Sequence, residues 1–238
     1  MAKPTVLIAQ PARQETNVYF LQRAAELIER LTYPSFSRIV WLNNQPAMRG
    51  KYEPHAAARN QFIDLYLDER FDYVLWIDID LIDYPADLVE RLMDVSLEHD
   101  GAIVAPMVWD ERRTFIVAVR TGIAVCGEWC RRTRPLPPLC DHGGIHYDIG
   151  GFIKDGQWSD QYRGVLGSED IEQMDSVGTC YLVPAWLYRH GLRYAPKAHD
   201  IEHLSFCEAA RGLGVQVLAV RDINILHPYL PNYGEAVH

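Results

Sequence analysis

The chain has 238 residues, 48% of them hydrophobic, and a formal net charge of −9 at pH 7. This length suits one α/β domain with a substantial core, and the acidic balance leaves no global electrostatic footprint for nucleic acid. No stretch approaches the ~18 consecutive apolar residues of a membrane span, and the first residues lack a signal-peptide pattern. We therefore expect a cytoplasmic protein without a transmembrane segment.

Apolar runs alternate with helical patterns along the first half of the chain. Strands are predicted over residues 5–10, 38–43, 73–77 and 102–108. Amphipathic helices are predicted between them and after the third, over residues 17–31, 55–68 and 85–98. This β-α-β alternation predicts an α/β fold with a mainly parallel central sheet, right-handed crossovers and helices on both faces.

The second half of the chain is less regular. Residues 121–161 are rich in Gly, Pro, Arg, Cys and aromatic residues and show no period, which is typical of a functional segment or a structural insertion. Beyond them, strands are predicted over residues 176–184 and 215–220, and helices over residues 185–190 and 199–212. Gly214 is expected to cap the last of these helices.

Two aspartates, Asp78 and Asp80, directly follow the apolar run Tyr73–Ile77. Side chains at i and i+2 of a strand share a face, so both carboxylates would project together if the strand geometry persists to Asp80. Pro85 fits the first turn of the following helix. Ligands of open α/β sheets bind beyond the carboxyl ends of the strands, where a carboxylate pair can hold a hard divalent cation. The alternative is a solvated turn that happens to contain aspartates.

The segment WIDIDLIDYPADLVERL, a hydrophobic strand followed by D-x-D, a spacer, Pro and a helix, resembles the DxD segment of GT-A glycosyltransferases. Within this superfamily, it is similar in particular to the Anp1-like mannosyltransferases and the family-2 glycosyltransferases. The resemblance implies a single Rossmann-like GT-A domain over residues 1–238. Residues 1–110 would form the nucleotide-sugar and metal-binding half, and residues 111–238 the acceptor-binding half. Asp78 and Asp80 would then bind Mn or Mg, which bridges the diphosphate of the donor.

The same resemblance implies roles for three further residues. Arg59, in the sequence AAARN, would lie near the donor; Gly178 would line the donor-sugar pocket; and His227, placed after the last predicted strand, would be an additional metal ligand. Each also has a plainer interpretation, namely a surface arginine, a bulge glycine and a structural histidine. Histidine suits Mn better than Mg.

Glu202 resembles the acidic residue at the start of the family's E-D-x-x-F-C helix, but His203 stands where many family-2 enzymes have an aspartate. In inverting members that aspartate is the base that deprotonates the acceptor hydroxyl. Here Glu202 or Asp200 would have to serve, or the mechanism is not the inverting one. Capping of the helix N-terminus by these carboxylates is the alternative.

The cysteines give a second, separate metal hypothesis. Cys126, Cys130, Cys140 and His142 form the pattern C-x3-C-x9-C-x-H, which could hold a tetrahedral zinc although it is not a standard finger spacing. Unrelated reduced cysteines are the alternative. Cys180 and Cys207 lie in apolar contexts and are predicted to be small core residues.

The resemblance implies an enzyme of the hexosyltransferase type, which transfers a sugar from a nucleoside diphosphate donor, UDP before GDP, to a hydroxyl. The acceptor stays open among a glycan, a protein, a small alcohol and a hydroxymethylated DNA base. The arginines in CRRTRP (residues 130–135) allow DNA, whereas the net charge argues against it. The alternatives are a nucleotidyltransferase, whose Gly-rich basic signature is missing after the first strand, and a non-catalytic GT-A-like domain that only binds a sugar or a partner.

Overall fold

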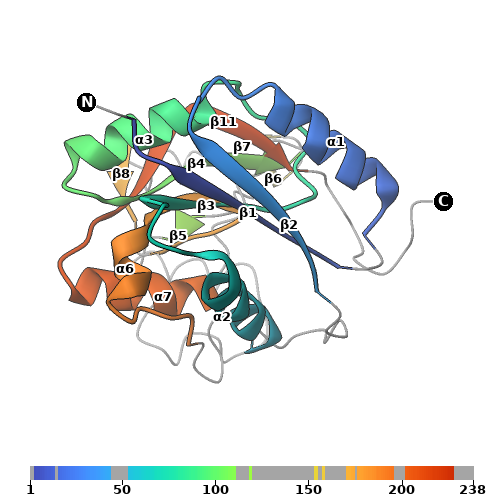
Figure 1. Cartoon of the computed structure of the whole chain (residues 1–238). Coiled ribbons are helices and arrows are strands. Elements are labelled where there is room, and N and C mark those ends of the chain that lie inside the picture. Colours follow the sequence, from blue (N-terminus) through green and yellow to red (C-terminus); the bar gives the residue numbers. More distant parts are fainter. Residues whose placement is uncertain are drawn as a thin grey trace, which may run out of the picture.

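A seven-stranded sheet forms the centre of the molecule (Figure 1). The computed structural model describes residues 3–13, 16–43, 53–110, 118–119, 153–154, 157–158, 170–174, 176–195 and 202–227. The strands of the sheet are β1 (Val6–Arg13), β2 (Phe36–Asn43), β3 (Tyr73–Ile77), β4 (Ile103–Asp110), β8 (Ile171–Gln173), β10 (Cys180–Pro184) and β11 (Val217–His227). Two short pairs are formed by β5 (Ala118–Val119) with β9 (Ser176–Val177) and by β6 (Ile153–Lys154) with β7 (Gln157–Trp158).

The strand order is β2-β1-β3-β10-β4-β11-β8. β1 pairs in parallel with β2 and β3, and β4 pairs in parallel with β11, whereas β10 is antiparallel to both of its neighbours and β8 is antiparallel to β11. Five strands therefore run in one direction and two run against them, as the predicted mainly parallel sheet requires. The insertion of β10 between β3 and β4 places strands from both halves of the chain in one sheet.

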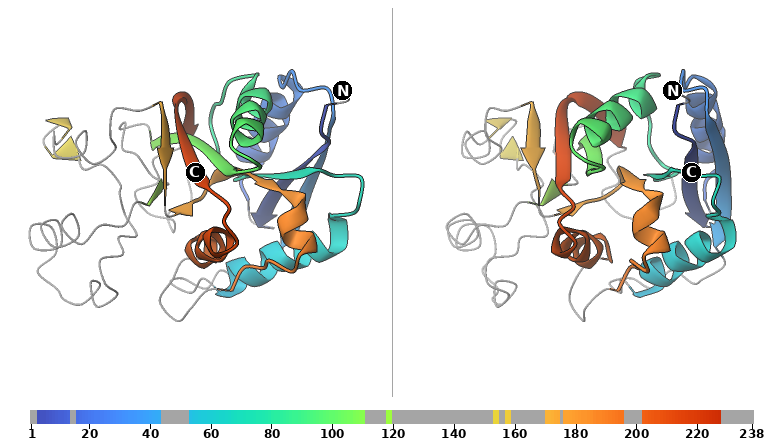
Figure 2. Two further views of the ribbon diagram at one scale, coloured as in Figure 1. Left: turned by 90° about the vertical axis from the view of Figure 1, so that its left-hand side faces the viewer. Right: turned by 60° about the vertical axis from the view of Figure 1, so that its left-hand side comes forward.

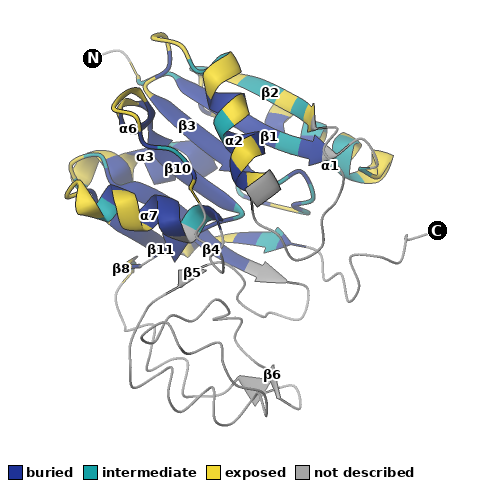
Figure 3. Ribbon diagram, turned by 90° about the horizontal axis from the view of Figure 1, so that it is seen from below, coloured by how far each residue is buried: buried dark blue, intermediate teal, exposed yellow. Residues whose placement is uncertain are grey.

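Helices cover both faces of the sheet (Figure 2). α1 (Val18–Glu29) and α3 (Leu88–Glu98) pack on one face. α2 (Glu53–Tyr66), α6 (Ala185–Arg189) and α7 (Glu202–Gly212) pack on the other. The strands between these layers are mostly buried, while α2 and α7 keep an exposed outer side (Figure 3). The predicted α/β fold is thereby confirmed.

The helix after β3 starts later than predicted. Asp87 is its N-cap and Leu88 its first residue, so Pro85 does not lie in the first turn. Instead, the carbonyl of Pro85 accepts a hydrogen bond from the Leu88 N–H (3.2 Å) in the turn that leads into the helix. At the end of α7 the predicted glycine cap is confirmed. Gly214 has φ +83°, and the N–H groups of Gly214 and Val215 donate to Arg211 and Ala210, as in a Schellman motif.

β11 is longer than predicted because it continues through a bulge. Val217–Val220 pair with Ile103–Pro106, and Asn224–His227 pair with Met107–Asp110, so three residues at 221–223 have no partner on β4. An odd number of extra residues reverses the alternation of side chains. Even-numbered Leu218 and odd-numbered Ile225 consequently pack in the same core, on the α3 side. His227, predicted to follow the last strand, is instead its final residue.

Candidate active site

Asp78 and Asp80 lie at the carboxyl end of β3, but in a turn rather than in a strand. β3 ends at Ile77, the N–H of Asp78 donates to the carbonyl of Thr179 (2.9 Å), and the N–H of Leu81 donates back to the carbonyl of Asp78 (3.5 Å). The condition that the strand geometry persists to Asp80 is therefore not met. Thr179 itself has φ 58°, which is uncommon for a β-branched residue, and it follows the buried Gly178.

The turn still brings the two carboxylates close enough to interact. Burial raises the pKa of Asp78 to about 6; the Arg59 guanidinium opposes this shift, and the Asp80 carboxylate adds to it. Asp78 nevertheless keeps 32% of its side-chain surface exposed. The end of β3 thus presents a carboxylate that is costly to ionise and that a nearby cation would stabilise.

His227 lies beside Asp80, with 3.4 Å between Nε2 and Oδ2. Backbone pairing fixes this arrangement, because Asp83, in the loop after the aspartates, forms an isolated β-bridge with Leu226. The N–H of Ile82 donates to the carbonyl of Leu226 (2.8 Å), and the N–H of Leu226 donates to the carbonyl of Asp83 (2.8 Å). The residue that precedes His227 is therefore hydrogen-bonded to the loop that follows Asp80.

The donor set of Asp78, Asp80 and His227 fits a divalent cation in chemistry. Carboxylate oxygens with one imidazole suit Mn. However, no three His, Cys, Asp or Glu side chains form a group that could hold a metal within the described part of the chain. The structure brings Asp80 and His227 together as a pair and Asp78 into their vicinity, without assembling the predicted three-ligand cluster.

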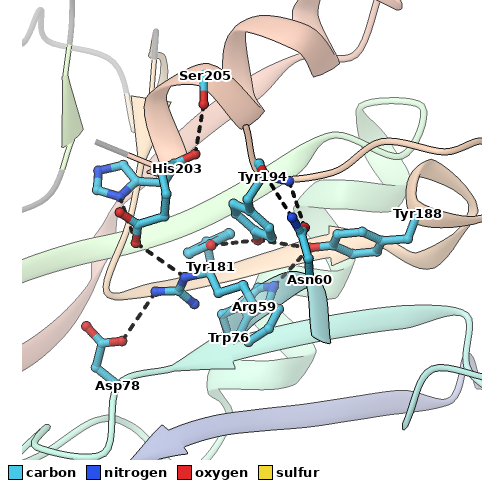
Figure 4. Close-up of polar contacts among 10 residues, drawn as sticks. Arg59, Asn60, Trp76, Asp78, Tyr181, Tyr188, Tyr194, His203 and Ser205 are labelled. Carbon is cyan, nitrogen blue, oxygen red and sulfur yellow. Dashed lines mark hydrogen bonds and ion pairs between the residues drawn. The ribbon is translucent and has the colours of Figure 1, made fainter. Parts of the chain in front are cut away.

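Arg59, on α2, connects the end of β3 with the start of α7 (Figure 4). Its Nε donates to Glu202 Oε1 (3.4 Å), and its Nη2 lies 3.7 Å from Asp78 Oδ1. The residue is 8% exposed, and its Nη1 is buried with no hydrogen-bond partner in the described part of the chain. The predicted donor-binding arginine is therefore a buried cation between two carboxylates.

Three aromatic rings enclose the guanidinium. The Arg59 Cζ lies 4.7 Å from the ring centroid of Trp76, 5.7 Å from that of Tyr194 and 5.8 Å from that of Tyr181. Such contacts are favourable for a desolvated cation. Trp76 lies two residues before Asp78 and pairs directly with Tyr181 on β10. The Trp76 and Tyr181 rings therefore contact Arg59 at the same end of the sheet as the Asp78 carboxylate.

The aromatic residues are themselves linked by hydrogen bonds. Trp76 Nε1 donates to the Tyr188 hydroxyl (2.9 Å), and the Tyr194 hydroxyl bonds those of Tyr188 (3.0 Å) and Tyr181 (2.8 Å). The backbone of Tyr194 is held by both ends of the Asn60 amide, at 2.8 Å and 2.9 Å. We did not predict this network. Its only sequence signal was the Arg-Asn pair on α2.

Glu202 is the first residue of α7 and is 5% exposed. Burial alone would raise its pKa, but His203 and the Arg59 guanidinium lower the pKa to about 2. A carboxylate this acidic is a weak base near neutral pH. The predicted base role of Glu202 stays untested, and its pairing with Arg59 counts against it.

Several predicted residues lie outside the described part of the chain. They are Asp200, the zinc candidates Cys126, Cys130, Cys140 and His142, and the arginines of CRRTRP. Cys180 and Cys207 are described, and both are free, buried cysteines, which confirms their predicted place in the core.

Comparison with known proteins identifies the fold. The Anp1 family model matches residues 42–117, a segment that contains Arg59, Asp78 and Asp80. A crystal structure of GalNAc-T7 with UDP, GalNAc and Mn2+ superposes with a TM-score of 0.54 at 11% identity, covering 98% of this chain and 46% of that one. S. aureus TarS 1–349 gives a TM-score of 0.54 at 8% identity, with coverages of 94% and 60%.

The chain thus has the GT-A fold of glycosyltransferases, and the predicted resemblance to GT-A and Anp1-like proteins is confirmed. It spans about half of the GalNAc-T7 chain and three fifths of the TarS chain. No curated protein sequence matches it. Among the helices that the structure describes, none is long and apolar enough to cross a membrane.

Proposed function

We propose that this protein is a metal-dependent glycosyltransferase that transfers a sugar from a nucleoside diphosphate donor to a hydroxyl group. UDP is the first choice of nucleotide and GDP the second. The observation that carries the proposal is that Asp78 and Asp80 follow the carboxyl end of β3 in a GT-A fold, with His227, the last residue of β11, 3.4 Å from Asp80. That edge is where open α/β sheets bind ligands.

In this proposal Asp78, Asp80 and His227 hold Mn or Mg. A divalent cation bound there would neutralise charge that develops on the leaving diphosphate. The Mn2+ and UDP in the GalNAc-T7 structure support the choice of metal and nucleotide. Gly178 is buried beside Thr179, whose carbonyl accepts a hydrogen bond from the Asp78 N–H, and would allow close approach of the donor.

The residue that would deprotonate the acceptor hydroxyl is a separate question. Glu202 is hydrogen-bonded to Arg59, and His203 together with the Arg59 guanidinium lowers its pKa to about 2. We therefore favour Asp200, or a mechanism without a protein base, over Glu202. The acceptor is a hydroxyl of a glycan, a protein or a small alcohol; a hydroxymethylated DNA base is disfavoured by the net charge of −9.

A donor screen tests the proposal. The protein is incubated with UDP-sugars and GDP-sugars and Mn2+, with or without excess EDTA, and release of the nucleoside diphosphate is followed by mass spectrometry. We expect the nucleoside diphosphate to be released from one class of donor, and excess EDTA to abolish this release. Product formation from ATP or CTP would instead support a nucleotidyltransferase, and binding of donors without any turnover would support a non-catalytic domain.

A further inference from the structure

We propose that Glu202 is a positioning residue that holds the Arg59 guanidinium at ion-pair distance from Asp78, without a hydrogen bond, so that the Asp78 carboxylate can bind a cation. This inference rests on the proposed function. It gives Glu202 a role other than that of acceptor base, and it concerns residues of this chain that touch one another directly (Figure 4).

The distances show which carboxylate Arg59 prefers. Nε reaches Glu202 Oε1 within hydrogen-bond range, at 3.4 Å, whereas Nη2 stays 3.7 Å from Asp78 Oδ1, beyond that range. Burial explains the preference. The Glu202 side chain is 7% exposed and that of Asp78 is 32% exposed. A buried carboxylate needs its counter-ion more than one in contact with water.

The aromatic rings around the guanidinium limit which acidic side chains can contact it. Trp76, Tyr181 and Tyr194 enclose it, and Asp78 and Glu202 are the carboxylates in ion-pair contact with it among the described residues. Nη1 is buried without an acceptor among the residues that the structure describes, so within this part of the chain the arginine still has hydrogen-bonding capacity to satisfy. If Glu202 lost its charge, Asp78 would be the one charged partner left in contact with Arg59 among the described residues.

Loss of the Glu202 charge would therefore weaken cation binding in two ways. Arg59 would close the gap to Asp78 and occupy its oxygens, and the unneutralised guanidinium would repel a divalent cation. Both effects would lower the affinity of the site for a cation. A general base close to the metal would also contribute its charge, so what identifies a positioning role is the dependence of the effect on Arg59.

The test is a titration of the purified protein with Mn2+, followed by calorimetry, alone and with UDP or GDP present. We expect Glu202→Gln to bind Mn2+ about 10-fold more weakly than the wild type, the order expected for one charge a few ångströms away. Glu208→Gln, the same substitution at an exposed position of α7, is the matched control and should leave the affinity unchanged.

The double variant Arg59→Gln/Glu202→Gln separates positioning from simple structural damage. Removal of the competing cation should restore most of the Mn2+ affinity, and in the Arg59→Gln background Glu202→Gln should change that affinity little, which makes the two substitutions strongly non-additive. Wild-type affinity in Glu202→Gln, or a double variant as weak as Glu202→Gln alone, would overturn the inference.

Two further outcomes must be distinguished from the results that would overturn the inference. If the wild type binds no Mn2+ with or without a nucleotide, the proposed metal dependence fails, and this inference fails with it. If Glu202→Gln does not fold, as judged by circular dichroism, Glu202→Asp replaces it. The shorter carboxylate reaches Arg59 less well, so we expect a smaller loss of the same sign, and an unchanged affinity would count against the proposal.

Discussion

Asp80 and His227 lie far apart in the sequence, yet Oδ2 of the aspartate is 3.4 Å from Nε2 of the histidine. Two backbone features bring them together. The three extra residues at 221–223 reverse the alternation of β11, and the β-bridge between Asp83 and Leu226 joins the end of that strand to the loop after Asp80. The contact is therefore built by main-chain pairing.

The first prediction concerns the metal. Asp80→Asn should remove most Mn2+ binding, because it takes away one ligand charge without changing the volume of the side chain. Titration calorimetry measures the loss. Asp87→Asn, at an exposed N-cap position without a side-chain hydrogen bond, is the matched control. Equal Mn2+ affinities in Asp80→Asn and the wild type would remove Asp80 from the proposed site.

The second prediction concerns the nucleotide. UDP or GDP should raise the Tm only when Mn2+ or Mg2+ is present, because a ligand that binds the native state stabilises it by mass action. At 100 times its Kd, a ligand should add about 2.7 kcal/mol to the free energy of unfolding. Thermal scans with and without EDTA measure the difference. Equal shifts in both conditions would contradict a metal that bridges protein and diphosphate.

Much of the fold could be predicted because the sequence signals were local. The five apolar residues of β3 are bounded by Asp72 and Asp78, so the strand has the predicted limits. Gly214 supplies the positive φ that its cap requires. The start of α3 was misjudged because Pro85 suits a first helical turn, whereas the structure uses Asp87 as the cap.

The candidate site could be predicted only in part, because most of it depends on long-range packing. The D-x-D pattern located Asp78 and Asp80, but the bulge in β11 that turns His227 toward Asp80 has no pattern in the sequence. Nor does spacing along the chain reveal that Arg59 lies between Asp78 and Glu202. Those contacts arise from the packing of α2 and α7 on the same face of the sheet.

The third prediction is that two carboxylates of the site affect stability in opposite directions. The pKa of Asp78 is raised from 3.8 to about 6, so its contribution to the free energy of unfolding is present below pH 4 and is lost as the pH rises through 6. The pKa of Glu202 is lowered from 4.5 to about 2, so its contribution is present above pH 4.5 and is lost as the pH falls toward 2.

At pH 7, in EDTA, Asp78→Asn should therefore raise the Tm and Glu202→Gln should lower it. Calorimetry at pH 7 and pH 4 measures both effects, and the gain from Asp78→Asn should shrink at pH 4, where the native aspartate is already protonated. A stabilising active-site substitution is the expected sign of a carboxylate placed for function. Destabilisation by Asp78→Asn at pH 7 would show that its pairing with Arg59 outweighs the cost of its burial.

The last prediction concerns the tyrosines around Arg59. Tyr194→Phe removes a hydroxyl that bonds both Tyr181 and Tyr188. Tyr188 keeps its hydrogen bond from Trp76 Nε1, but the buried Tyr181 hydroxyl loses this partner. An unsatisfied buried hydroxyl costs about 1–3 kcal/mol, which should lower the Tm by roughly 2–12 °C in a protein of this size.

The control for this effect is Tyr19→Phe, which removes a hydroxyl from a tyrosine that is 56% exposed and should leave the Tm unchanged. A second variant tests the cause. In the Tyr194→Phe background, Tyr181→Phe removes the hydroxyl that lost its partner and should recover part of the lost stability, because position 181 then carries no unpaired hydroxyl. If the double variant is instead less stable than Tyr194→Phe by the full cost of a second lost hydrogen bond, the Tyr181 hydroxyl has found another partner, and the network is not the closed unit that its geometry indicates.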